Sequence, residues 1–252
     1  MKTITFIGNG NMALSIAKGL KGKYKIEVVG REIKKLEQFE KFLGVSIEKH
    51  LLNGFDTTDK TVILCVKPAN VEDVSKKITG RARVIFSVLA GTSLEKLRTN
   101  LNPQAVVRTM PNLAASVGKS MTTLTGDELF KDEAEKLLGA IGKTLWLSSE
   151  KEIDIATALA GSGPAYLALI AEAFADGAVK QGLKRDDSMN LMRGLFDGFG
   201  TLIQEIHPAL LKDGVMSPGG TTAAGYSALE DGNVRSACIN AIEKAYKKAT
   251  EL

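Results

Sequence analysis

The sequence predicts an α/β protein in which a Rossmann-type doubly wound sheet in the N-terminal part is followed by an all-α C-terminal part. Strand-like and helix-like segments alternate over the first 150 residues, as expected of a sheet built from βαβ units. The segments "TVILCV" and "RVIFSVL" are apolar throughout, which is typical of parallel strands covered on both faces. After about residue 150 the strand patterns stop, so we place a domain boundary near 149–151, between residues 1–150 and residues 151–252.

The N-terminal elements follow from hydrophobic periodicity and from the glycines that end segments. Short stretches rich in β-branched residues predict strands at 3–8, 25–30, 45–49, 61–68, 83–91, 105–111, 121–126 and 144–148. Helical spacing predicts helices at 11–22, 31–44, 71–78, 93–100 and 127–141. Together these segments give the alternation that a doubly wound sheet requires.

The C-terminal segments are rich in alanine and helical in their spacing, at 164–182, 186–206, 221–230 and 234–250. The apolar stretch 155–179 contains Glu172 and Asp176, so we expect a buried helix of a soluble protein and not a membrane span. A domain of about a hundred residues built from such helices has little interior of its own. We therefore expect a homo-oligomer in which two subunits share a core through these helices.

The composition argues against several classes of partner. The chain has 252 residues, a net charge of +4 and no run of Lys and Arg interleaved with aromatic residues, so no nucleic-acid surface is expected. Two distant cysteines, Cys65 and Cys238, fit a reducing compartment. The apolar run at the N-terminus is too short for a secretory signal. A cytoplasmic protein is expected.

The two histidines do not predict a metal site. His50 lies in a segment that we expect to be an exposed loop, and His207 precedes Pro208 as a helix cap. Neither has cysteines or acids at a spacing typical of metal ligands.

The first predicted strand leads into a glycine-rich loop, "FIGNGNMA", that opens the first helix. Gly8 permits the tight turn, Gly10 lets a pyrophosphate approach the backbone, and Ala13 keeps the helix close to the sheet. A glycine-rich turn without a ligand is the alternative. The position between strand and helix favours a dinucleotide site, formed by Gly8, Asn9, Gly10, Asn11 and Met12.

The end of the second strand distinguishes between the two nicotinamide cofactors. An NAD site usually has an acid there, which accepts a hydrogen bond from the ribose 2′-hydroxyl. This chain has Arg31, whose guanidinium suits a 2′-phosphate. Glu32 follows directly and keeps NADH open as an alternative to NADPH.

A second glycine-rich stretch, "MSPGGTTAAGY", begins at Met216 and contains no acid, base or cysteine. The residues after Gly220 have helical character, so Thr221 or Thr222 is the expected N-cap. Gly219 and Gly220 can adopt positive φ and turn successive N–H groups inward. Such a loop can hold a carboxylate at the positive end of a helix, although an ordinary helix start explains the residues equally well.

Four stretches resemble the pyrroline-5-carboxylate reductase family, and with the glycine loop they cover most of the chain. They are "CVKP" (65–68), "VVRTMPN" (106–112), "GSGPAYLALIAEAFADGAVKQGL" (161–183) and "HPALLKDGVMSPGGTTAAGYSALE" (207–230). The resemblance implies an NAD(P)H-binding Rossmann domain and a helical domain that intertwines with a second subunit. It also implies the reduction of 1-pyrroline-5-carboxylate to L-proline, the last step of proline biosynthesis.

The resemblance also implies roles for particular residues. The substrate carboxylate would be held by Ser217, Gly219, Gly220, Thr221 and Thr222, and the Thr222 hydroxyl would meet the ring nitrogen as the catalytic group. Val66, Lys67 and Pro68 would lie along the cofactor, with Met110 and Pro111 against the nicotinamide and Asn53 near the adenine. Two departures occur beside this pocket: Leu113-Ala114 replaces Thr-Pro, and Ser120 stands where a glycine is common.

Two other functions were weighed against this one. A β-hydroxyacid dehydrogenase needs a catalytic lysine on the interdomain helix, and none occurs between Gly163 and Lys180. A protein that binds NADPH without catalysis would explain the first domain but not the stretch 217–222. An imine reductase with a different substrate range stays open.

Overall fold

The computed structural model describes residues 1–251, which form two compact units. The first comprises Met1–Ser162 with the end of the chain from Ala245, and the second comprises Gly163–Lys244. The division falls later in the chain than the predicted boundary near 149–151, because the helix α6 (Glu150–Ala156) packs against the sheet of the first unit.

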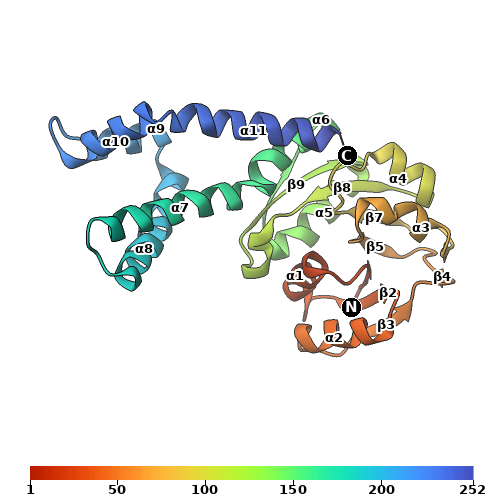
Figure 1. Ribbon diagram of the computed structural model, residues 1–252. Helices are drawn as coiled ribbons and strands as arrows, with labels where there is room; N and C mark the ends of the chain where they lie inside the picture. The colour runs from red at the N-terminus through yellow and green to blue at the C-terminus, as the bar shows by residue number, and fades with distance from the viewer. Residues whose placement is uncertain (252) are drawn as a thin grey trace. The chain divides into compact units, whose positions relative to one another are not determined.

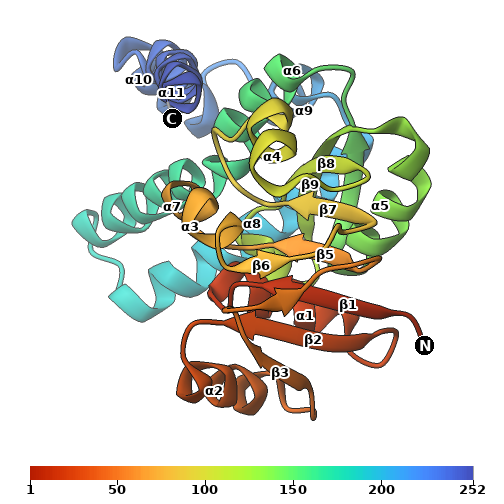
Figure 2. The same cartoon turned by 90° about the vertical axis from the view of Figure 1, so that its right-hand side faces the viewer.

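The first unit contains an eight-stranded sheet in the order β10-β9-β8-β7-β5-β1-β2-β3. Its strands are β1 (Thr3–Ile7), β2 (Lys25–Gly30), β3 (Glu48–Leu51), β5 (Thr61–Leu64), β7 (Val84–Ser87), β8 (Val106–Met110), β9 (Ser120–Gly126) and β10 (Gly142–Trp146). Neighbours pair in parallel, except β8 and β9, which are antiparallel. The strand order reverses between β1 and β5, the usual place for a ligand in such sheets (Figure 2).

Helices cover both faces of the sheet, as the apolar strands predicted. On one face, α1 (Asn11–Leu20), α2 (Ile33–Leu43) and α5 (Lys131–Leu138) bury side chains such as Ile16, Leu36 and Leu138. On the other face, α3 (Val71–Ser75) and α4 (Leu94–Leu101) bury Val74 and Leu97. The predicted Rossmann-type α/β domain is confirmed.

Several predicted boundaries were wrong. The helix expected at 127–141 is broken into the 3₁₀ turn Glu128–Phe130, α5 and the 3₁₀ turn Gly139–Ile141. The helix expected at 71–78 ends at Ser75, and a two-residue strand β6 (Ile78–Thr79) follows, paired with β4 (Phe55–Asp56). Strands this short depend on a partner distant in the chain and leave no periodic pattern in the sequence.

The C-terminal part is helical, as predicted (Figure 1). A π-helical turn (Thr157–Gly161) joins α6 to α7 (Gly163–Lys180), and the remaining helices are α8 (Arg185–Glu205), α9 (Pro208–Val215), α10 (Thr221–Asp231) and α11 (Val234–Thr250). Within the second unit, the structure buries few side chains, chiefly Ala171, Ala175 and Ser188.

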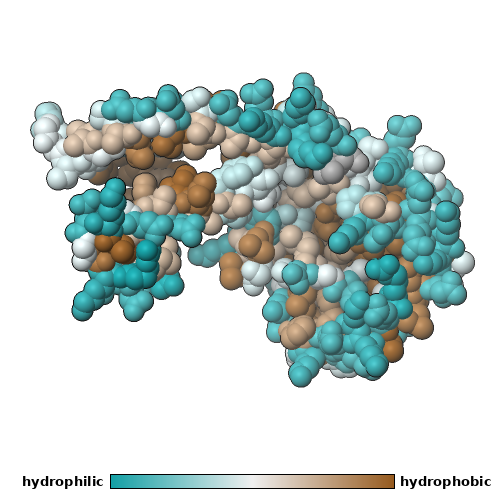
Figure 3. All heavy atoms as spheres, in the orientation of Figure 1, coloured by the Kyte–Doolittle hydropathy of each residue, from teal (hydrophilic) through white to brown (hydrophobic). Residues whose placement is uncertain are grey.

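The apolar helix expected to be buried is mostly exposed in the single chain. The helical run Glu150–Lys180 is long and apolar enough to span a membrane by length and composition alone, a test that core helices of soluble proteins also pass. The prediction of a buried helix was wrong for the isolated chain, because its own helices cover only a small part of this one. Apolar side chains are visible on the surface of the second unit in Figure 3.

Candidate cofactor and substrate sites

The first glycine loop uses its two glycines differently. Gly8 has φ +108°, and a β-carbon there would lie 2.6 Å from the carbonyl oxygen of Cys65, the residue directly after β5. Gly10 has φ −80° and is the N-cap of α1, and a β-carbon there would meet nothing within 4 Å. Gly8 is therefore required by the fold, whereas Gly10 keeps open the space in front of the helix N-terminus.

A pocket of about 470 Å³ lies in front of this loop, at the carboxyl ends of β1, β2 and β5. Its lining residues are Ile7, Gly8, Asn9, Gly10, Val29, Gly30, Arg31, Leu52, Cys65, Val66, Lys67, Asn70, Asp73 and Val74. This is the edge of the sheet where the strand order reverses, and the volume suits a small-molecule ligand. Burial raises the pKa of the Cys65 thiol, so Cys65 contributes an uncharged wall.

The pocket brings together part of the predicted cofactor set. Gly8, Asn9, Gly10, Arg31, Val66 and Lys67 line it, whereas Asn11, Met12, Asn53, Pro68, Met110 and Pro111 do not. Leu52, the residue before Asn53, lines the pocket. Asn70 and Asp73 also line the pocket but were not predicted from the sequence. They follow "CVKP" on a 3₁₀ turn and a short helix, and no sequence motif marks these two positions as ligand-binding.

Arg31 follows the end of β2 and is exposed at the pocket rim. Its side chain has no hydrogen bond or ion pair with any residue in 1–251. The adjacent Glu32 is paired instead with Lys35, at 2.6 Å, and this hydrogen bond lowers the pKa of the Glu32 carboxyl. Of these two neighbours, Arg31 lines the pocket and Glu32 does not.

The loop after β8 is held by a network around Asn112. Its side-chain amide donates to the carbonyl of Ala160 in the π-helical turn at 3.0 Å, and its side-chain oxygen accepts from the N–H of Ala114. The backbone N–H of Asn112 donates to the hydroxyl of Ser120 at 3.1 Å. The serine that departs from the family pattern thus helps to fix the loop that begins at Pro111, directly after Met110.

The second glycine loop differs in detail from the prediction. Gly220 is the N-cap of α10, with φ −77°, so the expectation of Thr221 or Thr222 at this position was wrong. The chain turns at Pro218-Gly219, where Gly219 has φ +71°. Because of this turn, the helix begins at least one residue earlier than predicted. The N–H of Gly220 donates to the carbonyl of Ser217 at 3.0 Å. Gly220 therefore neither needs positive φ nor offers its amide to a ligand.

Other donors remain at this helix start. No described side chain caps the first turn, so the amides of Thr221 and Thr222 are open donors at the positive end of the helix dipole. Position 220 requires a glycine for a different reason: a β-carbon there would lie 2.4 Å from the hydroxyl oxygen of Ser217. The Ser217 hydroxyl consequently lies against the loop, beside these amides.

A cluster that sequence reasoning missed connects the helices around this loop. Lys212 of α9 lies over the ring of Tyr226 on α10, with Nζ 5.2 Å from the ring centroid. The Tyr226 hydroxyl donates to Glu230 and accepts from Arg235 of α11 at 2.7 Å. The two helices that flank the loop are thereby linked. Of these residues, only Tyr226 and Glu230 lie four residues apart on one helix, a spacing from which a contact can be predicted.

Of the two predictions about the histidines, the one for His207 is confirmed and the one for His50 was wrong. His207 is the N-cap of α9, and its Nδ1 accepts from the N–H of Ala209 at 3.2 Å, which confirms the predicted cap. His50 lies in strand β3 and not in a loop, a correction that follows from its parallel pairing with β2.

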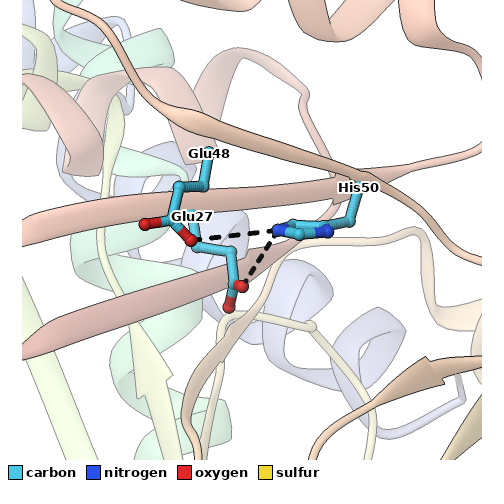
Figure 4. A group of neighbouring side chains, drawn as sticks. All are labelled: Glu27, Glu48 and His50. Carbon is cyan, nitrogen blue, oxygen red and sulfur yellow. Dashed lines mark ion pairs between the residues drawn. The ribbon is translucent and has the colours of Figure 1, made fainter.

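His50 also belongs to a group of potential metal ligands with Glu27 and Glu48 (Figure 4). Glu27 is buried in β2 and already accepts from Thr5 at 2.5 Å and from Lys60 at 3.0 Å. The Lys60 ammonium compensates the charge of the Glu27 carboxylate, whereas Nε2 of His50 is buried and has no hydrogen-bond partner among the described residues. That the chain needs no metal stays a prediction.

Comparison with known proteins gives matches along the whole chain. A family model described as pyrroline-5-carboxylate reductase dimerisation matches residues 150–252, and one described as NADP oxidoreductase, coenzyme F420-dependent, matches residues 3–91. The pyrroline-5-carboxylate reductase of Glycine max is 37% identical, covering 99% of this chain and 96% of that protein. That of Helicobacter pylori is 32% identical, with 98% and 99% covered.

Solved structures agree with this match. The 1-pyrroline-5-carboxylate reductase of Streptococcus pyogenes has a TM-score of 0.87 at 31% identity, with 99% of this chain and 98% of that chain covered. The pyrroline-5-carboxylate reductase of Coxiella burnetii has a TM-score of 0.82 at 33% identity, with 98% and 97% covered.

Proposed function

Because the chain belongs to the pyrroline-5-carboxylate reductase family, we propose that it reduces 1-pyrroline-5-carboxylate to L-proline with NADPH, as the final step of proline biosynthesis. The observation that carries the proposal is the likeness, over nearly the full length of both chains, to relatives named for this activity. The two glycine loops supply what the reaction requires: a place for a dinucleotide and a place for a small carboxylate.

The first glycine loop and the pocket in front of it would hold the cofactor. The open space at Gly10 and the N-terminus of α1 suit a pyrophosphate, and the unpaired Arg31 suits a 2′-phosphate. Val66 and Lys67 line the route along the sheet edge, and Met110 and Pro111 lie at the end of β8, where the nicotinamide would be placed. These features favour NADPH and leave NADH as a weaker alternative.

The second glycine loop would hold the substrate carboxylate. The amides of Thr221 and Thr222 are free donors at a helix N-terminus, and the Ser217 hydroxyl is a third donor beside them. Gly219 makes the turn, and Gly220 makes room for Ser217. A carboxylate bound here needs no lysine or arginine, because hydrogen bonds to a charged acceptor are stronger than those to a neutral one.

The chemistry places few demands on the protein. When bound, reduced nicotinamide supplies a hydride to the imine carbon. A protonated imine already carries positive charge, so the residues have to hold and orient the ring more than to activate it. The Thr222 hydroxyl, one residue into α10, would contact the ring nitrogen and fix the face that the ring presents.

The second unit would form a homodimer through its helices, and larger assemblies can build on it. Leu169 of α7 is 67% exposed, and Leu191 and Leu195 of α8 are also exposed, more apolar surface than a monomer usually leaves in water. The charged residues Glu172 and Asp176 on α7 make it unfavourable for a lipid bilayer to cover this apolar surface. A second copy of the same helices supplies an apolar cover. The free cysteines fit a cytoplasmic protein. The lack of a run of Lys and Arg interleaved with aromatic residues fits a protein with no nucleic-acid partner.

The test follows the absorbance of reduced cofactor when purified protein, NADPH and 1-pyrroline-5-carboxylate are mixed. We expect substrate-dependent loss of NADPH, and Thr222→Ala should lower kcat/KM about 10- to 100-fold, the range for one hydrogen bond to a charged group. Thr221→Ala is the matched control, since its backbone amide is retained, and should change the rate much less. NADPH loss no faster than the blank would refute the activity, and unchanged turnover in Thr222→Ala would refute that residue's role.

A further inference from the structure

The proposed cofactor pocket contains a negatively charged residue, which would repel the phosphate groups of a dinucleotide. Among its lining residues, Arg31 and Lys67 are basic, and Asp73 is the one carboxylate. Asp73 lies in the first turn of α3, so it faces the pocket from a different element than Arg31, which follows β2. The nearby Glu72 on the same helix is exposed and does not line the pocket.

Asp73 is held in place and held ionised. Lys77, one turn further along, donates to its carboxylate at 2.8 Å. This hydrogen bond is the largest cause that lowers the pKa of the Asp73 carboxyl, and the positive charges of Lys77, Arg31 and Lys76 add to it. Asp73 is part of the pocket lining, whereas its partner Lys77 is not. Arg31 is close enough for its field to act on Asp73.

The two nicotinamide cofactors differ at the group that this charge would act on. A 2′-phosphate brings between one and two negative charges, whereas a 2′-hydroxyl is neutral. We propose that Asp73 is a specificity-determining residue for the cofactor: its carboxylate opposes the 2′-phosphate and moderates the preference for NADPH that Arg31 creates. The inference rests on the proposed role of Arg31. Arg31 would attract the 2′-phosphate of NADPH and Asp73 would repel it. Because these two effects partly cancel, the enzyme could still use NADH.

Asp73→Asn removes the charge and keeps the shape of the side chain. We expect the ratio of kcat/KM for NADPH to that for NADH to rise roughly three- to tenfold at low salt, and the increase to shrink at high salt. Glu72→Gln is the matched control: it makes the same change of net charge one residue away and should leave the ratio unchanged. An Asp73→Asn ratio equal to that of Glu72→Gln would overturn the inference.

Lys77→Met separates an electrostatic role from a structural one. It removes the compensating charge but keeps the Asp73 carboxylate in the pocket lining, so the NADPH to NADH ratio should fall. If Asp73 served only to fix α3 through its ion pair, Lys77→Met and Asp73→Asn would change both cofactors alike, and that result would also overturn the inference.

Arg31→Ala distinguishes this inference from the function on which it rests. We expect this variant to lose most of the preference for NADPH. If it does so while Asp73→Asn behaves like Glu72→Gln, the role of Arg31 stands and that of Asp73 fails. If Arg31→Ala leaves the ratio unchanged, the proposed cofactor assignment itself is wrong.

Discussion

Gly8 and Gly10 illustrate how two residues of one motif depend on different physics. The positive φ of Gly8 and the carbonyl of Cys65 beside it exclude a side chain whether or not a ligand is present. The open space at Gly10 matters only when a ligand fills it. A single substitution at each position can therefore separate folding from cofactor binding.

We predict that Gly8→Ala lowers the free energy of unfolding of the cofactor-free protein by about 1–3 kcal/mol, the scale of a strained backbone residue. Gly10→Ala should change it by less than about 1 kcal/mol, because its φ suits any residue. It should instead weaken NADPH binding, since the new methyl group occupies the phosphate side of the loop. Urea unfolding and a cofactor titration measure the two effects. Equal unfolding free energies for the two variants would contradict this division.

Glu133 of α5 gives a prediction for pH. Burial alone would raise the pKa of its carboxyl, but the hydrogen bonds from Arg83 and Lys2 outweigh burial and lower it. A lowered folded-state pKa stabilises the protein above the unfolded value, near 4.5, and this contribution is lost as the pH falls through the folded value.

Glu133→Gln should therefore lower the free energy of unfolding at pH 7, by at most about 1 kcal/mol because the pair is partly solvated. The difference from the unsubstituted protein should shrink as the pH falls below about 4.5. Urea titrations at a series of pH values measure it. A difference that stays constant from neutral to acidic pH would show that the charge is irrelevant.

At the scale of elements, Arg108 ties β8 to α6. Its side chain is only 3% exposed, and its guanidinium pairs with Glu150 at 2.9 Å and with Asp154 at 2.6 Å. Glu150 also accepts from the N–H of Leu94 at the start of α4. This contact explains why α6 packs with the first unit, after the predicted boundary near residue 150.

Arg108→Met should destabilise the protein by about 2–4 kcal/mol, because it leaves partly buried carboxylates without their counter-charge. Arg98→Met, which breaks the more exposed pair with Asp127, is the control and should remain within about 1 kcal/mol. Chemical denaturation measures both. Similar losses in the two variants would mean that burial does not set the strength of the Arg108 pairs.

The elements predicted from sequence are those whose pattern is local. The apolar strands at 61–64 and 84–87 and the glycine loop after β1 were located correctly, because periodicity and turn chemistry are written in adjacent residues. The β4–β6 pair, the burial of Arg108 in an apolar strand and the pocket position of Asp73 depend on contacts between distant segments. No local pattern encodes such contacts.

The second glycine loop shows how far the candidate site could be predicted from the sequence. The sequence identified a helix start that could hold an anion, but it assigned the cap one or two residues late and gave Gly220 an amide role. Which N–H groups are free depends on the hydrogen bond from Gly220 to Ser217, and that requires the turn geometry of Gly219. The amides of Thr221 and Thr222 remain the proposed donors.

For the whole molecule, the exposed apolar helices predict assembly. Leu169→Glu on α7 should weaken self-association about tenfold or more, because it places a charge where an apolar side chain is expected to be covered. Leu129→Glu, at a side chain 92% exposed in the first unit, is the control and should leave association unchanged. Sedimentation velocity over a range of concentrations measures this. A monomer in the unsubstituted protein, or equal association in both variants, would contradict the shared core.

The central proposal is that main-chain amides at the start of α10 hold the substrate carboxylate. The most direct measurement is a crystal structure of the complex with L-proline and NADP⁺. We predict the proline carboxylate within hydrogen-bonding distance, roughly 2.7–3.1 Å, of the N–H groups of Thr221 and Thr222. Proline bound elsewhere, or with its carboxylate away from these two amides, would contradict the proposal.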